Sequence, residues 1–440
     1  RQLGGRAITA GYSAVIGLGA TSLIYDNLWR GPLLPFTVGA VCTPVLIILL
    51  DRYLRRPAVD TGAVLACAAV GLLALHPSTL FGAVLFAVPM LVQRWWRAAE
   101  TIGPDLARLA VPAVTALVLG SPLLLGSLAA AGQTLGFDWP ATFQVSRSVG
   151  SLLVFQHDVA GPQLSLAVPL WVGLAACRRL GELRWLLGTA VLLGALFVAA
   201  ASYDNRWVTL VTSPWWNDQY RLIALATIPL CVIAGHGLAE IQQWLTGLLP
   251  ARSGGPVPSA VVAVLVLAVF AVLSDGCYTA LNATVVARGY AQDTRGTLTR
   301  GELAAIRELG RLVQPGQWVM NDRGDGTGWM YALAGVRPVA GHFVVDGIGP
   351  DAALLGERFS RYDTDPDVRA AAARLHVGYV LVGSGFVRDY LHRQPGLWDL
   401  ADRPFLDVVY RNEDAVIYRL DPSAGRSIAT PMLHAVRGTV

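Results

Sequence analysis

Residues 213–221 read SPWWNDQYR and place several reactive side chains between two strongly apolar segments. Asn217, Asp218, Tyr220 and Arg221 supply an amide, a carboxylate, a phenol and a guanidinium. A carboxylate can accept a proton as a general base, and a guanidinium binds phosphate through paired hydrogen bonds. Arg221 is also expected at the start of a helix, where backbone N–H groups favour anions. The stretch therefore predicts the phosphate-binding end of a site for a lipid-linked substrate.

Candidate bases and phosphate ligands also occur at the ends of other apolar runs. The candidate catalytic bases are Asp218, Asp204 and Asp26, and the candidate ligands of the donor phosphate are Arg206 and Arg221. Each has a structural alternative. Both arginines could reach toward lipid headgroups, and Asp218 could cap a helix. Asp204 could pair with Arg206, and Asp26 could simply end the first helix.

The residues expected to orient the substrate are His76, Asn217, Tyr220 and Trp216. His76 could instead be a turn histidine, and Trp216 could belong to an aromatic belt at the membrane interface. His157 and Asp158 lie in a polar loop, residues 129–162, and are assigned no role.

A second polar stretch, NDRGDG (321–326), lies far along the chain. It resembles the start of a calcium loop, but the third position is Arg323 and the twelfth is Ala332, which are not calcium ligands. We predict that Asp322 and Asp325 bind a polar part of the substrate, with a surface turn as the alternative. No metal site is predicted, although a divalent metal stays open because the carboxylates are dispersed.

The composition is that of a multipass membrane protein. Of the 440 residues, 54% are hydrophobic and 15% are charged. The basic residues are all arginine without a dense basic block, which does not favour nucleic-acid binding. The five cysteines show neither CxxC nor metal-ligand spacing. Apolar runs predict about nine membrane helices, near 7–24, 32–50, 59–75, 79–93, 108–128, 163–177, 185–202, 220–238 and 257–275.

Arginines predict the orientation of these helices. They concentrate in alternate short loops, such as DRYLRR (51–56), which the positive-inside rule places in the cytoplasm. The SPWWNDQYR stretch and everything after residue 276 would then be extracytoplasmic, with the protein in the plasma membrane. The predicted domains are a membrane module at 1–276, an α/β domain at 277–422 and a tail at 423–440.

The α/β domain is predicted from alternating helix and strand patterns. The expected helices are 301–313 and 365–375, the expected strands are 317–320 and 376–383, and a hairpin is expected at 405–420.

Four segments carry a family resemblance: ALHPSTLFGAVLFAVP (74–89), SPWWNDQYRLIALATIPL (213–230), NDRGDGTGWMYALAGVRPV (321–339) and FLDVVYRNEDAVIYRL (405–420). Together they resemble an actinobacterial family of multipass membrane proteins that is similar to the GT-C class of glycosyltransferases. That class includes mycobacterial members tied to arabinogalactan and related cell-wall glycans. The resemblance implies a GT-C-like membrane fold with an extracytoplasmic α/β domain. It also implies transfer of a sugar from a polyprenyl-phosphate donor to a cell-wall glycan, in contact with membrane lipids.

The chain departs from the GT-C pattern in the first outer loop, where such enzymes carry an essential carboxylate. Here that loop, YDNLWRGP (25–32), offers Asp26 alone. The base is therefore expected either at one of the candidate carboxylates or upstream of Arg1. Two other readings remain, a non-catalytic glycan- or lipid-binding membrane subunit and a polyprenyl-lipid transporter.

Overall fold

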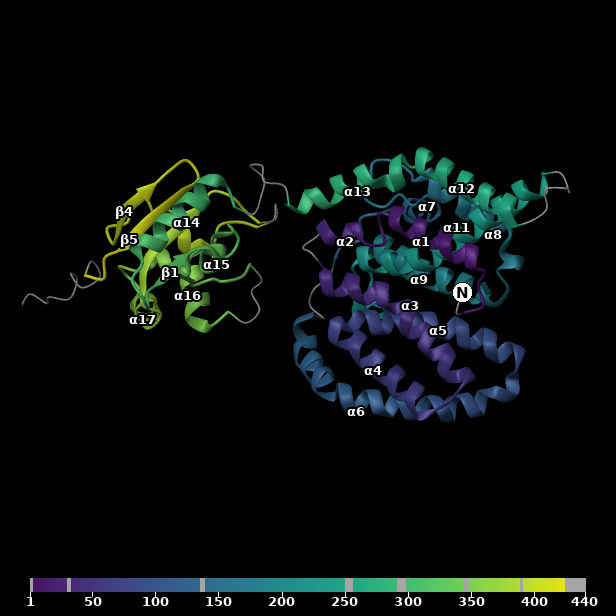
Figure 1. The fold of residues 1–440 in the computed structure, drawn as a ribbon. Helices are drawn as coiled ribbons and strands as arrows, with labels where there is room; N and C mark the ends of the chain where they lie inside the picture. Colours follow the sequence, from purple (N-terminus) through teal and green to yellow (C-terminus); the bar gives the residue numbers. More distant parts are fainter. Residues whose placement is uncertain are drawn as a thin grey trace, which may run out of the picture. The chain divides into compact units, whose positions relative to one another are not determined.

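The computed structural model describes residues 3–29, 33–134, 139–249, 256–290, 298–343, 348–387 and 391–423. The chain divides into two compact units, Arg1–Tyr290 and Ala291–Val440 (Figure 1). The first is helical and the second contains a small sheet, which confirms the predicted fold class. Except for its first residue, the tail predicted at 423–440 lies outside the described residues.

The helical unit is built from apolar helices joined by short polar segments. Its elements are α1 (Ala7–Gly19), α2 (Tyr25–Trp29), α3 (Leu34–Arg55), α4 (Val59–Leu75), α5 (Pro77–Arg97), η1 (Ala99–Thr101), α6 (Ile102–Thr134), α7 (Val145–Val154), α8 (Leu164–Ala175), η2 (Cys177–Arg184), α9 (Trp185–Ser202), α10 (Arg206–Thr212), η3 (Ser213–Trp215), α11 (Gln219–Gly247), α12 (Pro256–Leu273) and α13 (Asp275–Tyr290).

Each of the nine predicted spans corresponds to a helix, but the helices differ in length. Among the described residues, six helical stretches are long and apolar enough to cross a membrane. The helices α1, α4 and α8 are apolar but shorter, with 13, 17 and 12 residues. About 20 residues are needed to cross the hydrocarbon core without help from neighbours.

Helix α11 forms the centre of the helical unit. In its apolar window 89% of the residues are buried, and it packs most extensively against α8, α1 and α9. Glycines allow the close approach of α8 and α11. A Cβ at Gly237 would overlap the Pro169 carbonyl oxygen, and one at Gly173 would overlap the Ile233 carbonyl oxygen. Small residues commonly permit such backbone contact between membrane helices.

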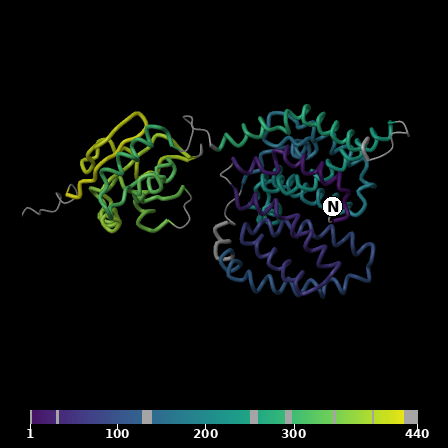
Figure 2. Tube along the Cα trace, in the orientation of Figure 1, coloured from purple at the N-terminus to yellow at the C-terminus, as the bar shows by residue number. Residues whose placement is uncertain are grey.

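The boundary between the two units falls after residue 290. The sequence pattern predicts it after residue 276. Helix α13 continues beyond residue 276 and packs against α2 and α1 (Figure 2). These segments are more than two hundred residues apart, yet the Thr21 hydroxyl donates to Asn282 Oδ1 over 2.7 Å. The contact between α13 and the start of the chain thus makes residues 277–290 part of the helical unit.

The second unit carries a five-stranded sheet in the order β2-β1-β3-β5-β4. Its strands are β1 (Trp318–Asn321), β2 (Arg337–Pro338), β3 (Val377–Gly383), β4 (Leu406–Arg411) and β5 (Ala415–Leu420). Its helical elements are α14 (Arg300–Leu312), η5 (Thr327–Trp329), α15 (Met330–Ala334), α16 (Pro350–Arg358), η6 (Phe359–Arg361), α17 (Pro366–Arg374) and η7 (Pro395–Leu397). β1 is parallel to β2 and β3, whereas β5 is antiparallel to β3 and β4. The predicted hairpin, strands and helices of this domain are all confirmed.

Alternation along the strands creates two apolar faces, as strand geometry requires. Leu381 and Ile417 belong to the core beneath α14 and α15, whereas their neighbours Val380 and Tyr418 belong to the core beneath α16 and α17. Helix α14 begins at a capping box, in which the side chains of Thr299 and Glu302 bond to each other's backbone N–H groups.

Candidate functional site

A buried carboxylate–imidazole pair lies in the helical unit, between α2 and the segment that precedes α8. Asp26 Oδ2 is 3.0 Å from His157 Nδ1, and both side chains are 0% exposed. The second oxygen of Asp26 and Nε2 of His157 have no hydrogen-bond partner among the described residues. Buried polar atoms normally find partners, and exceptions often mark functional positions. Asp26, predicted as a base, is therefore joined by a histidine to which the sequence assigned no role.

Tyr220 connects this pair to a second carboxylate. The ring of Tyr220 lies 4.6 Å from that of His157, and its hydroxyl donates to Asp158 Oδ2 over 3.1 Å. Arg288 of α13 donates to the Asp158 carbonyl oxygen over 3.1 Å. Asp26, His157, Tyr220, Asp158 and Arg288 form what we call the dyad cluster. Its members come from four separate segments of the chain.

A second group surrounds Arg221, one residue further along α11. The Arg221 side chain is 12% exposed, and its Nε lies 3.4 Å from Asp218 Oδ2. Its guanidinium carbon lies 4.3 Å from the centre of the Trp216 ring. The ring of His76 packs edgewise on Trp216 at 5.2 Å and on Phe36 at 5.6 Å. We call these five residues the arginine cluster.

The turn before α11 has the geometry that aims these side chains. Trp216 and Asn217 adopt positive φ angles of 56° and 54°, and Asn217 Oδ1 accepts from the Thr212 hydroxyl over 2.5 Å. Asp218 then caps α11 by accepting from the Tyr220 backbone N–H over 2.9 Å. Asp218 therefore interacts with both the Tyr220 backbone N–H and the Arg221 guanidinium. The capping alternative stated from the sequence is thus observed.

The clusters are linked through the first polar segment of the chain. The backbone N–H of Leu33, which precedes α3, donates to the Asn27 carbonyl oxygen over 3.0 Å. This hydrogen bond connects α2, which carries Asp26 of the dyad cluster, to the residue before α3, which carries Phe36 of the arginine cluster. A second connection runs along α11, because Tyr220 of the dyad cluster and Arg221 of the arginine cluster are consecutive residues.

Asp204 and Arg206 do not join either cluster. Asp204 is exposed and its Oδ1 accepts from the Ala141 backbone N–H over 2.7 Å, which ties the loop before α7 to the end of α9. Arg206 is exposed at the start of α10, which Asn205 caps. No ion pair joins Asp204 to Arg206 in the described part of the chain, so the predicted pairing alternative is not observed.

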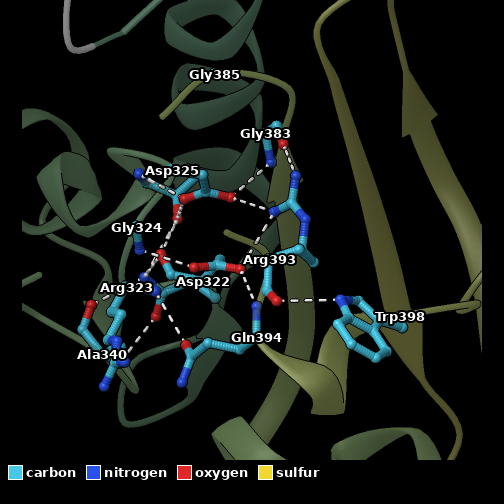
Figure 3. Close-up of polar contacts among 12 residues, drawn as sticks. Asp322, Arg323, Gly324, Asp325, Ala340, Gly383, Gly385, Arg393, Gln394 and Trp398 are labelled. Atoms are coloured by element: carbon cyan, nitrogen blue, oxygen red, sulfur yellow. Dashed lines mark hydrogen bonds and ion pairs between the residues drawn. The ribbon is translucent and has the colours of Figure 1, made fainter. Parts of the chain in front are cut away.

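Asp322 and Asp325 lie in the α/β unit, where both are 0% exposed. Figure 3 shows their polar contacts. Asp322 accepts from the backbone N–H groups of Gly324 and Gln394 over 2.7 and 2.8 Å. Asp325 accepts from the Gly383 backbone N–H and from Arg393, each over 2.9 Å. The two carboxylates thus bond to the protein's own loops.

Burial changes the acidity of one of these groups. It raises the pKa of Asp325 to about 7 from the ordinary 3.8, whereas hydrogen bonds from Thr327 and Gly383 and the charge of Arg393 act in the opposite direction. Because both carboxylates are buried and hydrogen-bonded to other segments, the loop 321–328 is braced from within and is not the simple surface turn that was the alternative.

In chemical terms, the dyad cluster offers a carboxylate oriented by a histidine, and the arginine cluster offers a cation against an aromatic wall. The first arrangement suits proton transfer, and the second suits binding of an anion such as phosphate. No group of three or more His, Cys, Asp or Glu side chains gathers at metal-binding distance in the described residues. The sequence signal that could have identified the dyad was the pair His157-Asp158 within a polar break between two apolar helices.

No curated protein matches the sequence significantly. Among solved structures, the chain is similar to an archaeal oligosaccharyltransferase, AglB from Archaeoglobus fulgidus, determined with an inhibitory peptide and a dolichol-phosphate. The identity is 15% and the TM-score 0.34, over 83% of this chain and 51% of the other, so the chain spans about half the length of that protein. A likeness of this degree does not assign an activity. A protein family described as a family of unknown function (DUF6541) matches residues 1–422, and the chain therefore belongs to this family.

Proposed function

We propose that the protein is a membrane glycosyltransferase of the GT-C type, which transfers a sugar from a polyprenyl-phosphate donor to a cell-envelope glycan on the extracytoplasmic side. The observation that carries the proposal is the convergence of the dyad cluster and the arginine cluster on consecutive residues of α11. A transferase of this type needs a base for the acceptor and a cation for the phosphate that leaves, held close to each other.

The proposed reaction is a single displacement at the sugar C1. Asp26 removes the proton of the acceptor hydroxyl, whose oxygen forms a bond to C1 as the bond from C1 to the phosphate oxygen breaks. The departing polyprenyl phosphate takes the electron pair, and Arg221 stabilises its charge. His157 acts as a positioning residue for Asp26. Because the dyad is fully buried, substrate binding has to open this end of the helical unit before Asp26 can meet the acceptor.

Of the remaining candidates, His76 and Trp216 are best suited to line the phosphate and sugar, because they contact Arg221 or its aromatic wall. Asp218 is the partner of Arg221 and is better suited to orienting that cation than to acting as the base. The proposal gives no direct role to Asp204, Arg206, Asp322 or Asp325, whose contacts lie elsewhere.

The test is an assay with the purified full chain, a radiolabelled polyprenyl-phosphate sugar and a glycan acceptor. Arg221→Ala should abolish transfer while the protein keeps its helical circular dichroism. Arg55→Ala is a matched control, because Arg55 lies at the far end of α3 from Phe36 and pairs with Asp51 on the surface. Full transfer by Arg221→Ala would refute the assignment.

The complete burial of Asp26 and His157 favours one alternative, a non-catalytic subunit that holds the lipid or glycan for a partner. In that case the same assay shows that the labelled donor binds without turnover, and binding weakens in Arg221→Ala.

A further inference from the structure

The α/β unit contains a hollow whose lining includes no residue of either cluster. It has a volume of about 430 Å³ and lies between the loop 321–328, helix α15 and the segment 341–343. Its wall includes the side chains of Arg323, Trp329, Tyr331 and His342. Pockets for small polar ligands typically combine aromatic walls with a few well-placed polar groups, and this hollow has that composition.

The wall of the hollow is braced from within. Asp322 and Asp325, on either side of Arg323 and Gly324, are fully buried and bonded to the segment that carries Arg393 and Gln394 (Figure 3). The Arg323 backbone N–H is also held, because it donates to the Gln394 side-chain oxygen over 3.1 Å. Two buried carboxylates are costly to place in a short loop, and they keep its backbone in one conformation. The loop therefore presents Arg323 on a rigid support.

Arg323 contributes a cation that no carboxylate among the described residues neutralises. The side chain lines the hollow, and it forms no ion pair with any residue that the structure describes. The carboxylates next to it in the sequence pair instead with Arg393. An uncompensated guanidinium at the edge of a concave site favours a ligand with a carboxylate or phosphate group.

Two aromatic rings at the same hollow are left open to solvent. Trp329 is 54% exposed and Tyr331 is 63% exposed, although both belong to short helical elements whose neighbour Met330 is fully buried. The faces of such rings carry partial negative charge and pack against the polarised C–H groups on the apolar face of a sugar ring. Nearby, His342 stacks on Phe343 with ring centres 4.7 Å apart. Exposed aromatic rings and a guanidinium that line the same hollow fit a ligand that is part apolar ring and part anion.

We infer that this hollow binds an anionic sugar unit, whose ring packs on Trp329 and Tyr331 and whose acidic group pairs with Arg323. The inference goes beyond the proposed transfer reaction and does not depend on it, because the hollow lies within the α/β unit. The acidic group can come from a uronic acid or from a sugar phosphate, and the experiment has to separate these sources.

The test is calorimetric titration of the full chain in detergent with three probes, namely a glucuronic-acid disaccharide, glucose 1-phosphate and a neutral glucose disaccharide. We expect at least one anionic probe to bind more tightly than the neutral one, and the stronger of the two identifies the acidic group. Arg323→Ala should weaken the anionic probe by about tenfold, the loss expected for one charge-assisted contact, and leave the neutral probe unchanged. Trp329→Ala should weaken all probes that bind, and Trp329→Phe should restore most of the loss.

Arg337→Ala is the matched control, because this exposed arginine of β2 packs against Trp318 outside the hollow. It should leave all affinities unchanged. Circular dichroism and gel filtration verify that each variant is folded. The inference is wrong if no probe binds to the wild type, if the neutral probe binds as tightly as both anionic probes, or if Arg323→Ala and Arg337→Ala behave alike.

Discussion

The two polar regions of this protein use buried carboxylates in opposite ways. In the helical unit, one oxygen of Asp26 contacts His157, and the other has no hydrogen-bond partner in the part of the chain that the structure describes. In the α/β unit, Asp322 and Asp325 have oxygens engaged by backbone N–H groups and by Arg393. A carboxylate with unused bonding capacity is suited to chemistry, whereas one with several internal bonds is suited to bracing a loop. The following predictions test whether this contrast holds.

The largest effect is expected from Asp26→Asn. Under the proposed function, this change removes the base but keeps the size of the side chain, and general base catalysis typically contributes about 10²–10⁴-fold. The transfer rate should fall by that factor with an unchanged melting temperature. His157→Ala should also lower the rate and shift its pH profile, which a merely structural contact would not do. A large stability loss with normal activity would make the dyad a structural pair like those of the α/β unit.

The second prediction concerns the bracing pair. Arg393→Ala leaves buried carboxylates without their cation, which typically costs about 3–5 kcal/mol. The free energy of unfolding of the full chain at pH 8 should fall by this order, as measured by denaturant titration followed by intrinsic fluorescence. Arg374→Ala is a control, because its pair with Asp351 lies on the surface, where water screens the charges, and its loss should change the free energy of unfolding little. Equal effects from the two variants would contradict the bracing role.

The raised pKa of Asp325 gives a pH dependence with a definite sign. Unfolding returns the carboxyl to its ordinary pKa of 3.8, whereas in the native state it stays protonated up to about pH 7. Between these values the native state binds more protons than the unfolded state, so this group's contribution to stability falls as pH rises from about 4 to about 7. The same unfolding measurement on Asp325→Asn should show a flatter profile across this interval. An identical slope in both proteins would show that other groups control it.

A smaller effect is expected from Tyr220→Phe, which removes the hydroxyl that donates to Asp158 and keeps the ring beside His157. A single hydrogen bond of this kind contributes about 0.5–1.5 kcal/mol. Thermal unfolding should therefore shift only slightly, and transfer should continue. Loss of transfer comparable to that of Asp26→Asn would extend the catalytic role to the phenol.

Local features of the protein are well predicted by residue pattern. Apolar runs predict the six helical stretches that are long enough to cross a membrane among the described residues, although α1 and α8 prove shorter than expected and the short apolar helix α7 was expected to be loop. Alternation predicts the β4–β5 hairpin, and Asn412 closes its turn by accepting from the backbone N–H groups of Asp414 and Ala415. These features depend on neighbours within a few residues, which the sequence displays directly.

Pairings between distant residues are not predictable in the same way. Asp26 and His157 are 131 positions apart, and their contact depends on how α2 and the segment before α8 pack around α11. The pattern around residues 321–326 predicts a turn but cannot show that Asp322 and Asp325 face inward, since that depends on Arg393 and Gln394 some seventy residues later.

The sequence by itself determined a helical membrane-type unit followed by a small α/β unit, together with the polar stretches in each. It did so because apolar length, strand alternation and helix caps are local properties. Only the tertiary structure decided which carboxylate pairs with a buried histidine, which ones brace a loop, and that Arg323 lines a hollow. Those outcomes depend on burial and on partners brought together from distant segments, and no local pattern specifies either.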